Sequence, residues 1–213
     1  PVYLYCPHSA LEIKNRFPNS KLIISLRNPI EIAYSEYFSL KFMGFDQNRS
    51  FDELLDSSEE QLTRNEFHID SLLEAGFYSK HIKRFQKIFS KNQIKITIFE
   101  EYVKNTVPTI NSILSFLGIK ESITFDVTSK GAYKVPRNFA SQKLMNNSTF
   151  RKAAKFVIPT VTRQKIGERF LVKESSRPPL KQNQRKRLTQ IYQDDVENLS
   201  ELLGRNLPWK DFY

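Results

Sequence analysis

The clearest hydrophobic pattern in the chain is a short apolar run close to its beginning. Residues 21–26 (KLIISL) follow a turn-prone Pro-Asn-Ser and precede Arg27-Asn28-Pro29. An isoleucine-rich run of this length predicts a buried strand, and a proline just after it predicts the first turn of a helix. Apolar residues then recur at the spacing of one helix face, at Ile30, Ala33, Tyr34, Tyr37 and Phe38. The pattern therefore predicts a strand that leads directly into a helix.

Four more elements are predicted before residue 120. Residues 50–53 (SFDE) have the composition of a capped helix start, and an amphipathic helix is expected from Tyr78 to Phe89. The run QIKITIF at 93–99 predicts a second strand. A further helix is expected over 108–117, with Gly118 as its stop. This order of strands and helices predicts an α/β fold, a parallel sheet flanked by helices.

The chain changes character at about residue 130. An irregular start leads to an amphipathic stretch at 150–170, a loop at Arg177-Pro178-Pro179 and a long helix over 181–203 that ends at Gly204. We expect a single domain over 1–213, with an α/β core at 1–129 and a basic, helical carboxyl-terminal part at 130–213. No apolar stretch approaches the 18 or so residues of a membrane-spanning helix, so this chain is not expected to cross a membrane.

Charge is distributed unevenly over these two parts. The chain has 33 Lys and Arg against 23 Asp and Glu, a formal net charge of +10. Residues 1–129 have a net charge of −1, whereas 130–213 carry 18 basic and 7 acidic side chains, a net of +11. Such a segment predicts contact with a polyanion, such as nucleic acid, an anionic glycan, a phosphate-rich cofactor or a membrane surface; the alternative is a solvated basic face.

Arg27 has the position and the chemistry of a ligand-binding residue. In an open sheet of parallel strands, ligands bind at the carboxyl ends of the strands, where Arg27 is expected. The run KLIISLRNPIEIAYSEY at 21–37 resembles the 3′-phosphate-binding segment of sulfotransferases that use 3′-phosphoadenosine 5′-phosphosulfate (PAPS). The resemblance implies that Arg27 and Ser35 hold the 3′-phosphate, with partial positive charge from the helix amino end. The alternative is an arginine that only caps the sheet. Ile32 stands where the family usually has arginine.

Other segments resemble the same family in the same order. They are residues 75–82, 99–102, 116–119, 177–180, 192–196 and 203–209. The loop at 129–137 falls where sulfotransferases place a basic, glycine-containing loop over the adenine and 3′-phosphate. The resemblance therefore implies that Lys130, Gly131 and Arg137 bind the cofactor, and the alternative is an ordinary surface loop. The fold that the resemblance implies is the sulfotransferase fold, which is similar to that of P-loop nucleotide hydrolases.

One motif of the family is missing from this sequence. The 5′-phosphosulfate loop, typically Lys-x-Gly-Thr-Thr, does not occur, nor does the Gly-Lys-Ser/Thr of nucleotide hydrolases. In the resembling enzymes this loop precedes the segment matched by residues 1–5, so we expect a fold that is incomplete at its amino terminus and inactive alone. The catalytic base is upstream in many members and is left unassigned. His8, His68, His81 and Cys6 do not have metal-ligand spacing, and no metal is expected.

The resemblance implies transfer of a sulfuryl group from PAPS to a hydroxyl or amine, with 3′-phosphoadenosine 5′-phosphate (PAP) as the second product. The tail is similar to that of glycan-directed members, which favours a carbohydrate acceptor, and the basic segment favours an anionic glycan. Two alternatives stay open: a non-enzymatic polyanion-binding module and a related phosphoryl-transferring enzyme. No nucleic-acid-binding motif is present.

A single cysteine favours a reducing, cytoplasmic location, with a lumenal one as the alternative if an anchor precedes the chain.

Overall fold

The computed structural model describes residues 3–43, 48–64, 71–120, 134–136, 141, 172–174 and 177–213. They belong to two compact units, each described here by itself. The first comprises Pro1–Glu36, Ser50–Thr128 and Lys181–Tyr213, and the second comprises Tyr37–Arg49 and Ser129–Leu180. The last helix of the chain therefore groups with the predicted α/β core. The single-domain organisation stays a prediction.

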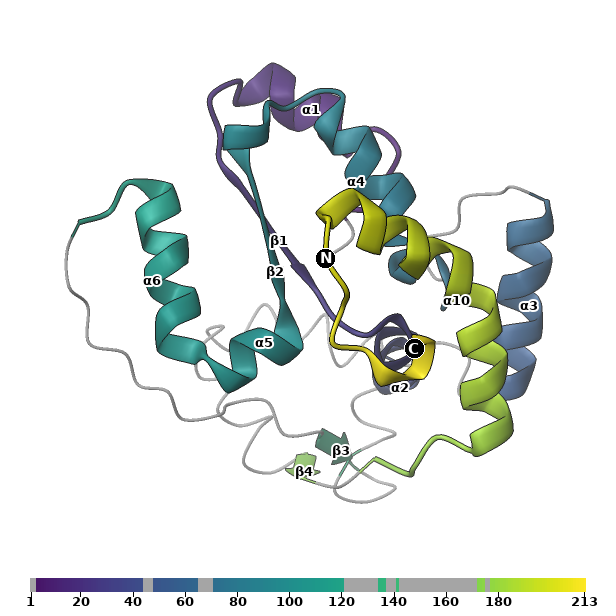
Figure 1. The fold of residues 1–213 in the computed structure, drawn as a ribbon. Coiled ribbons are helices and arrows are strands. Elements are labelled where there is room, and N and C mark those ends of the chain that lie inside the picture. The colour runs from purple at the N-terminus through teal and green to yellow at the C-terminus, as the bar shows by residue number, and fades with distance from the viewer. Residues whose placement is uncertain are drawn as a thin grey trace, which may run out of the picture. The chain divides into compact units, whose positions relative to one another are not determined.

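A parallel pair of strands lies at the centre of the first unit. Strand β1 (Leu22–Leu26) pairs with β2 (Ile94–Ile98) in a register that runs from Leu22 opposite Ile94 to Leu26 opposite Ile98 (Figure 1). Ile24 and Leu26 are buried and alternate with the exposed Ile23 and Ser25, as expected for a strand with one covered face. Both predicted strands and their parallel direction are confirmed.

The predicted helices are also present. They are α2 (Pro29–Met43), α3 (Phe51–Thr63), α4 (Tyr78–Gln86), α6 (Thr106–Leu117) and α10 (Gln182–Leu203). Ser50 and Glu53 form a capping box at the start of α3. Gly118 and Gly204 end α6 and α10 with φ angles of 84° and 66°, a left-handed conformation that glycine adopts at little cost.

Several shorter elements were not predicted. They are α1 (Ser9–Arg16), α5 (Phe99–Lys104) and the single 3₁₀ turns Glu74–Gly76, Lys91–Gln93 and Lys210–Phe212. In the second unit, β3 (Lys134–Pro136) and β4 (Val172–Glu174) form an antiparallel pair. These elements are too short to show hydrophobic periodicity; α1, for example, buries only Ser9 and Ala10. The predicted amphipathic stretch at 150–170 lies outside the described residues.

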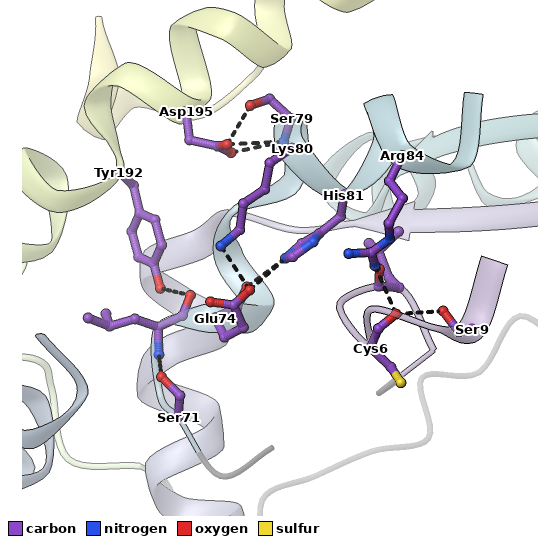
Figure 2. A network of polar contacts seen from close by, with 12 residues as sticks. Cys6, Ser9, Ser71, Glu74, Ser79, Lys80, His81, Arg84, Tyr192 and Asp195 are labelled. Atoms are coloured by element: carbon purple, nitrogen blue, oxygen red, sulfur yellow. Dashed lines mark hydrogen bonds and ion pairs between the residues drawn. The ribbon is translucent and has the colours of Figure 1, made fainter. Parts of the chain in front are cut away.

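Helix α10 is fastened to the segment around α4 by two buried polar contacts (Figure 2). The Asp195 carboxylate accepts hydrogen bonds from the backbone N–H of Ser79, at 3.1 Å, and from the Ser79 hydroxyl, at 2.5 Å. Asp195 thereby satisfies a donor at the amino end of α4 that the helix leaves unpaired. The buried Tyr192 hydroxyl donates to the carbonyl oxygen of Leu73 at 3.0 Å. These contacts join residues more than 110 positions apart and hold α10 in the core of the first unit.

Within the described ranges, no helix is both long and apolar enough to span a lipid bilayer.

Candidate cofactor site

Arg27 directly follows β1, at the carboxyl end of the parallel strands. Its guanidinium carbon lies 5.0 Å from the centroid of the Phe99 ring, and Phe99 directly follows β2. The two residues are adjacent because the register places Leu26 opposite Ile98. A guanidinium over an aromatic face is an attractive cation–π arrangement. In the part of the chain that the structure describes, Arg27 has no carboxylate partner.

The backbone at this strand end is held from two helices. The Tyr78 hydroxyl donates to the Arg27 carbonyl oxygen at 2.8 Å, and the Asn28 N–H donates to Glu100 Oε1 at 3.0 Å. Burial raises the pKa of Tyr78 far above its ordinary value, so this phenol stays protonated and remains a donor. The base of the Arg27 side chain is therefore fixed by α4 on one side and α5 on the other.

Asn28 caps helix α2. Its side-chain oxygen accepts from the Ile30 N–H at 3.0 Å, and its carbonyl oxygen accepts from the Ile32 N–H at 3.1 Å. Pro29, at the first helical position, has no N–H that would need a partner. The Arg-Asn-Pro sequence therefore ends the strand, starts the helix and leaves the arginine at the junction.

Ser35, the second predicted phosphate ligand, lies on α2 and is half-buried. Six residues separate it from Pro29, which is about 9 Å along the axis at 1.5 Å per residue. Ser35 therefore lies almost two turns into the helix that Arg27 precedes, and convergence of the two side chains on one phosphate stays a prediction. Lys130, Gly131 and Arg137, predicted from the basic loop, lie outside the described residues.

Residues near the carboxyl terminus complete the surroundings of the strand end. Trp209 Nε1 donates to Glu100 Oε2 at 2.9 Å, and Asn28 Nδ2 donates to Asp211 Oδ2 at 2.8 Å. Arg185 on α10 pairs with Asp211 at 3.0 Å. The sequence interpretation did not include Asp211 or Arg185, although a lone tryptophan near the terminus is a signal, because a buried indole N–H needs an acceptor.

A separate buried network surrounds His81 (Figure 2). His81 is 1% exposed, and its Nε2 lies 3.1 Å from the Glu74 carbonyl oxygen. Lys80 pairs with the Glu74 carboxylate at 2.8 Å. Burial lowers the pKa of His81 to about 4, because the interior disfavours the charged imidazolium. His81 is therefore a neutral packing residue at physiological pH.

Among the described residues, no group of three or more His, Cys, Asp or Glu side chains is arranged to hold a metal ion.

The fold is that of an α/β protein with an arginine at the carboxyl end of a parallel strand, and comparison with known proteins identifies the family. The model of the sulfotransferase domain matches residues 5–203, so the chain belongs to the sulfotransferase domain family, a family of transferases.

Two relatives illustrate the similarity. The chain is 27% identical over 113 residues to human bifunctional heparan sulfate N-deacetylase/N-sulfotransferase 2, a match that covers 52% of this chain and 13% of that protein. The crystal structure of a sulfotransferase from Alicyclobacillus acidocaldarius superposes with a TM-score of 0.63 and 22% identity. That match covers 96% of this chain and 63% of the other, and it confirms the predicted fold. The chain therefore spans only part of the length of both relatives.

Proposed function

We propose that this protein transfers a sulfuryl group from PAPS to a hydroxyl or amine of a carbohydrate. The observation that carries the proposal is Arg27, a strand-end arginine whose backbone is fixed by Tyr78 and Glu100 and whose guanidinium has no carboxylate partner in the described residues. Family membership supplies the reaction class, and this arginine supplies a means of recognising the donor.

The residues present fit the 3′-phosphate of PAPS. A guanidinium offers a planar fork of N–H donors that matches two phosphate oxygens at once. Phe99 supports the guanidinium from its face and leaves its edge donors for an anion. Ser35 would add a hydroxyl donor from α2. The 3′-phosphate distinguishes PAPS from nucleotides without it, so these residues would supply donor specificity.

The role of the described residues is binding and orientation. When bound, PAPS supplies an activated sulfuryl group on its 5′-phosphate. Arg27 would hold the opposite end of the nucleotide, and its fixed backbone would limit how far that end can move. Such positioning lowers the entropic cost of bringing donor and acceptor together. The Lys130, Gly131 and Arg137 loop remains a proposed second contact with the donor.

A carbohydrate acceptor is supported by two observations. The name of the human relative specifies heparan sulfate N-sulfotransferase activity. The excess of basic residues lies after residue 130, and such a segment attracts sulfated or carboxylated glycans. We infer that the acceptor is an anionic glycan, bound through charge as well as through its hydroxyl and amine groups.

Calorimetric titration of the full-length protein tests the donor site. We expect PAP to bind at least tenfold more tightly than AMP, because only PAP carries the 3′-phosphate. Arg27→Ala should abolish this preference and leave AMP binding unchanged. Arg16→Ala is the matched control, since Arg16 is exposed and, within the described ranges, forms an ion pair only with Glu12 on its own helix. Equal affinity of the unaltered protein for PAP and AMP would refute the proposal.

Transfer of radiolabelled sulfate from PAPS tests the acceptor. De-N-sulfated heparin, neutral oligosaccharides, a simple alcohol and a tyrosine peptide should be compared at equal concentration. The proposal expects label chiefly in de-N-sulfated heparin, with labelling that weakens as salt is raised. Preferential labelling of the tyrosine peptide or the alcohol would overturn the glycan assignment and leave the donor proposal standing.

A further inference from the structure

The carboxyl-terminal segment holds the strand end through one residue, Asn28. Asn28 is buried, and each of its polar groups has a partner. Its backbone N–H donates to Glu100 and its side-chain N–H to Asp211, while its two oxygens accept from Ile30 and Ile32. Because Asn28 is covalently joined to Arg27, any shift of Asn28 moves the arginine as well.

Two of these anchors depend on residues near the end of the chain. Glu100 bridges Asn28 and Trp209, because its Oε1 accepts from the former and its Oε2 from the latter. Asp211 likewise bridges Asn28 and Arg185. We call Arg185, Trp209 and Asp211 the carboxyl-terminal clip.

The clip also supplies hydrogen-bond donors to the carboxylates of Glu31, Glu100 and Asp211. Arg185 donates to Asp211 at 3.0 Å and to the Glu31 carboxylate at 2.7 Å, and Trp209 engages Glu100. Carboxylates with such donors are less available to pair with a neighbouring guanidinium. This is consistent with the absence of a carboxylate partner for Arg27 in the described chain, although Glu100 and Asp211 both contact Asn28.

We propose that the carboxyl-terminal clip is a positioning element for 3′-phosphate recognition, acting through Asn28 on Arg27. The inference rests on the proposed function, because it assumes that Arg27 binds the 3′-phosphate. The clip makes no contact with the phosphate itself. It fixes the direction in which the Arg27 guanidinium points and keeps nearby carboxylates paired elsewhere.

Asp211→Asn in the full-length protein separates positioning from simple charge repulsion. Removing a negative charge near a phosphate site would tighten PAP binding if repulsion were the only effect. Positioning predicts the opposite, a PAP affinity about three- to tenfold weaker. Asparagine has one acceptor oxygen and no charge, so the bridge from Arg185 to Asn28 is weakened. AMP affinity, measured by the same calorimetric titration, should not change. Asp194→Asn is the control of equal charge, since Asp194 is exposed on α10.

Trp209→Phe provides an independent variant, because it retains a six-membered aromatic ring and removes the five-membered ring whose N–H donates to Glu100. It should weaken PAP binding in the same range, and urea unfolding confirms that each variant is folded. Both effects should vanish when Arg27→Ala is also present, because the clip then has no arginine to position.

Three results are decisive. Unchanged or tighter PAP binding by folded Asp211→Asn and Trp209→Phe overturns the proposed positioning role of the clip. Equal losses for PAP and AMP, or losses that persist with Arg27→Ala, overturn it as well, since the effect would then be structural. No preference for PAP in the unaltered protein would instead refute the donor site on which the clip rests.

Discussion

Gly76 lies directly against the ring of Tyr192. A Cβ atom at Gly76 would be 2.7 Å from the Cε1, Cζ and hydroxyl atoms of that ring, which is closer than real Cβ atoms approach. The ring has no room to retreat, because Tyr192 is fully buried and its hydroxyl is bonded to the carbonyl oxygen of Leu73. A glycine and a tyrosine 116 positions apart are therefore one packing unit.

Gly76→Ala should lower the free energy of unfolding by about 1–3 kcal/mol, the usual cost of overpacking a core. Urea denaturation measures the change. Tyr192→Leu removes the ring, so Gly76→Ala should cost much less in that background than in the unaltered protein. The same loss in both backgrounds would contradict the steric explanation.

Phe99→Leu tests the support that the ring gives to Arg27. Leucine keeps an apolar side chain but loses the cation–π attraction, so PAP affinity should fall about two- to fivefold. Phe99→Tyr keeps the aromatic face and should retain affinity. Phe116→Leu is the matched control, because it removes a ring beneath Lys21 and Lys95 in the same unit without touching Arg27. Calorimetric titration with PAP measures all three, and a fall of the same size in Phe116→Leu would contradict the local effect.

Asp195→Ala should destabilise the first unit by about 2 kcal/mol, because it leaves the buried Ser79 N–H and hydroxyl without their acceptor. Ser79→Ala removes only the hydroxyl and should cost about 1 kcal/mol. Asp194→Ala, one residue away on the exposed side of α10, should stay within about 0.5 kcal/mol of the unaltered protein. Thermal or urea unfolding distinguishes them, and equal effects of the two aspartate variants would contradict the capping role.

The lowered pKa of His81 predicts how the free energy of unfolding depends on pH. Its pKa is about 4 in the folded protein against 6.5 ordinarily, so the unfolded chain binds more protons between these values. The free energy of unfolding should therefore fall as pH drops from about 6.5 to 4, by up to about 3 kcal/mol from this group, and level off below. Lys80 and Arg84 also lower the pKa, whereas the hydrogen bond to the Glu74 backbone raises it.

His81→Leu isolates this contribution from the carboxylates that titrate in the same range. The difference in unfolding free energy between the variant and the unaltered protein should change with pH between 6.5 and 4. A difference that is constant over this range would show that His81 does not supply the acid sensitivity.

Much of the fold was predictable because local rules decide it. The KLIISL run, the Asn-Pro helix start and the SFDE cap specify their elements through propensity and capping, and the structure confirms them. Short elements such as α5 were not predictable, because six residues are too few to show a hydrophobic periodicity. Arg27 could be singled out because the carboxyl end of a parallel strand is where ligands bind.

The amino-acid sequence by itself determined the α/β order, the family and the position of Arg27, because hydrophobic period, capping residues and motif order are local properties. Only the tertiary structure decided which distant residues surround that arginine. Phe99 lies beside Arg27 because of the strand register. Asp211 accepts from Asn28, and Trp209 donates to Glu100, which also accepts from Asn28. Contacts across 72 and 183 residues depend on how elements pack, and no local pattern encodes that geometry.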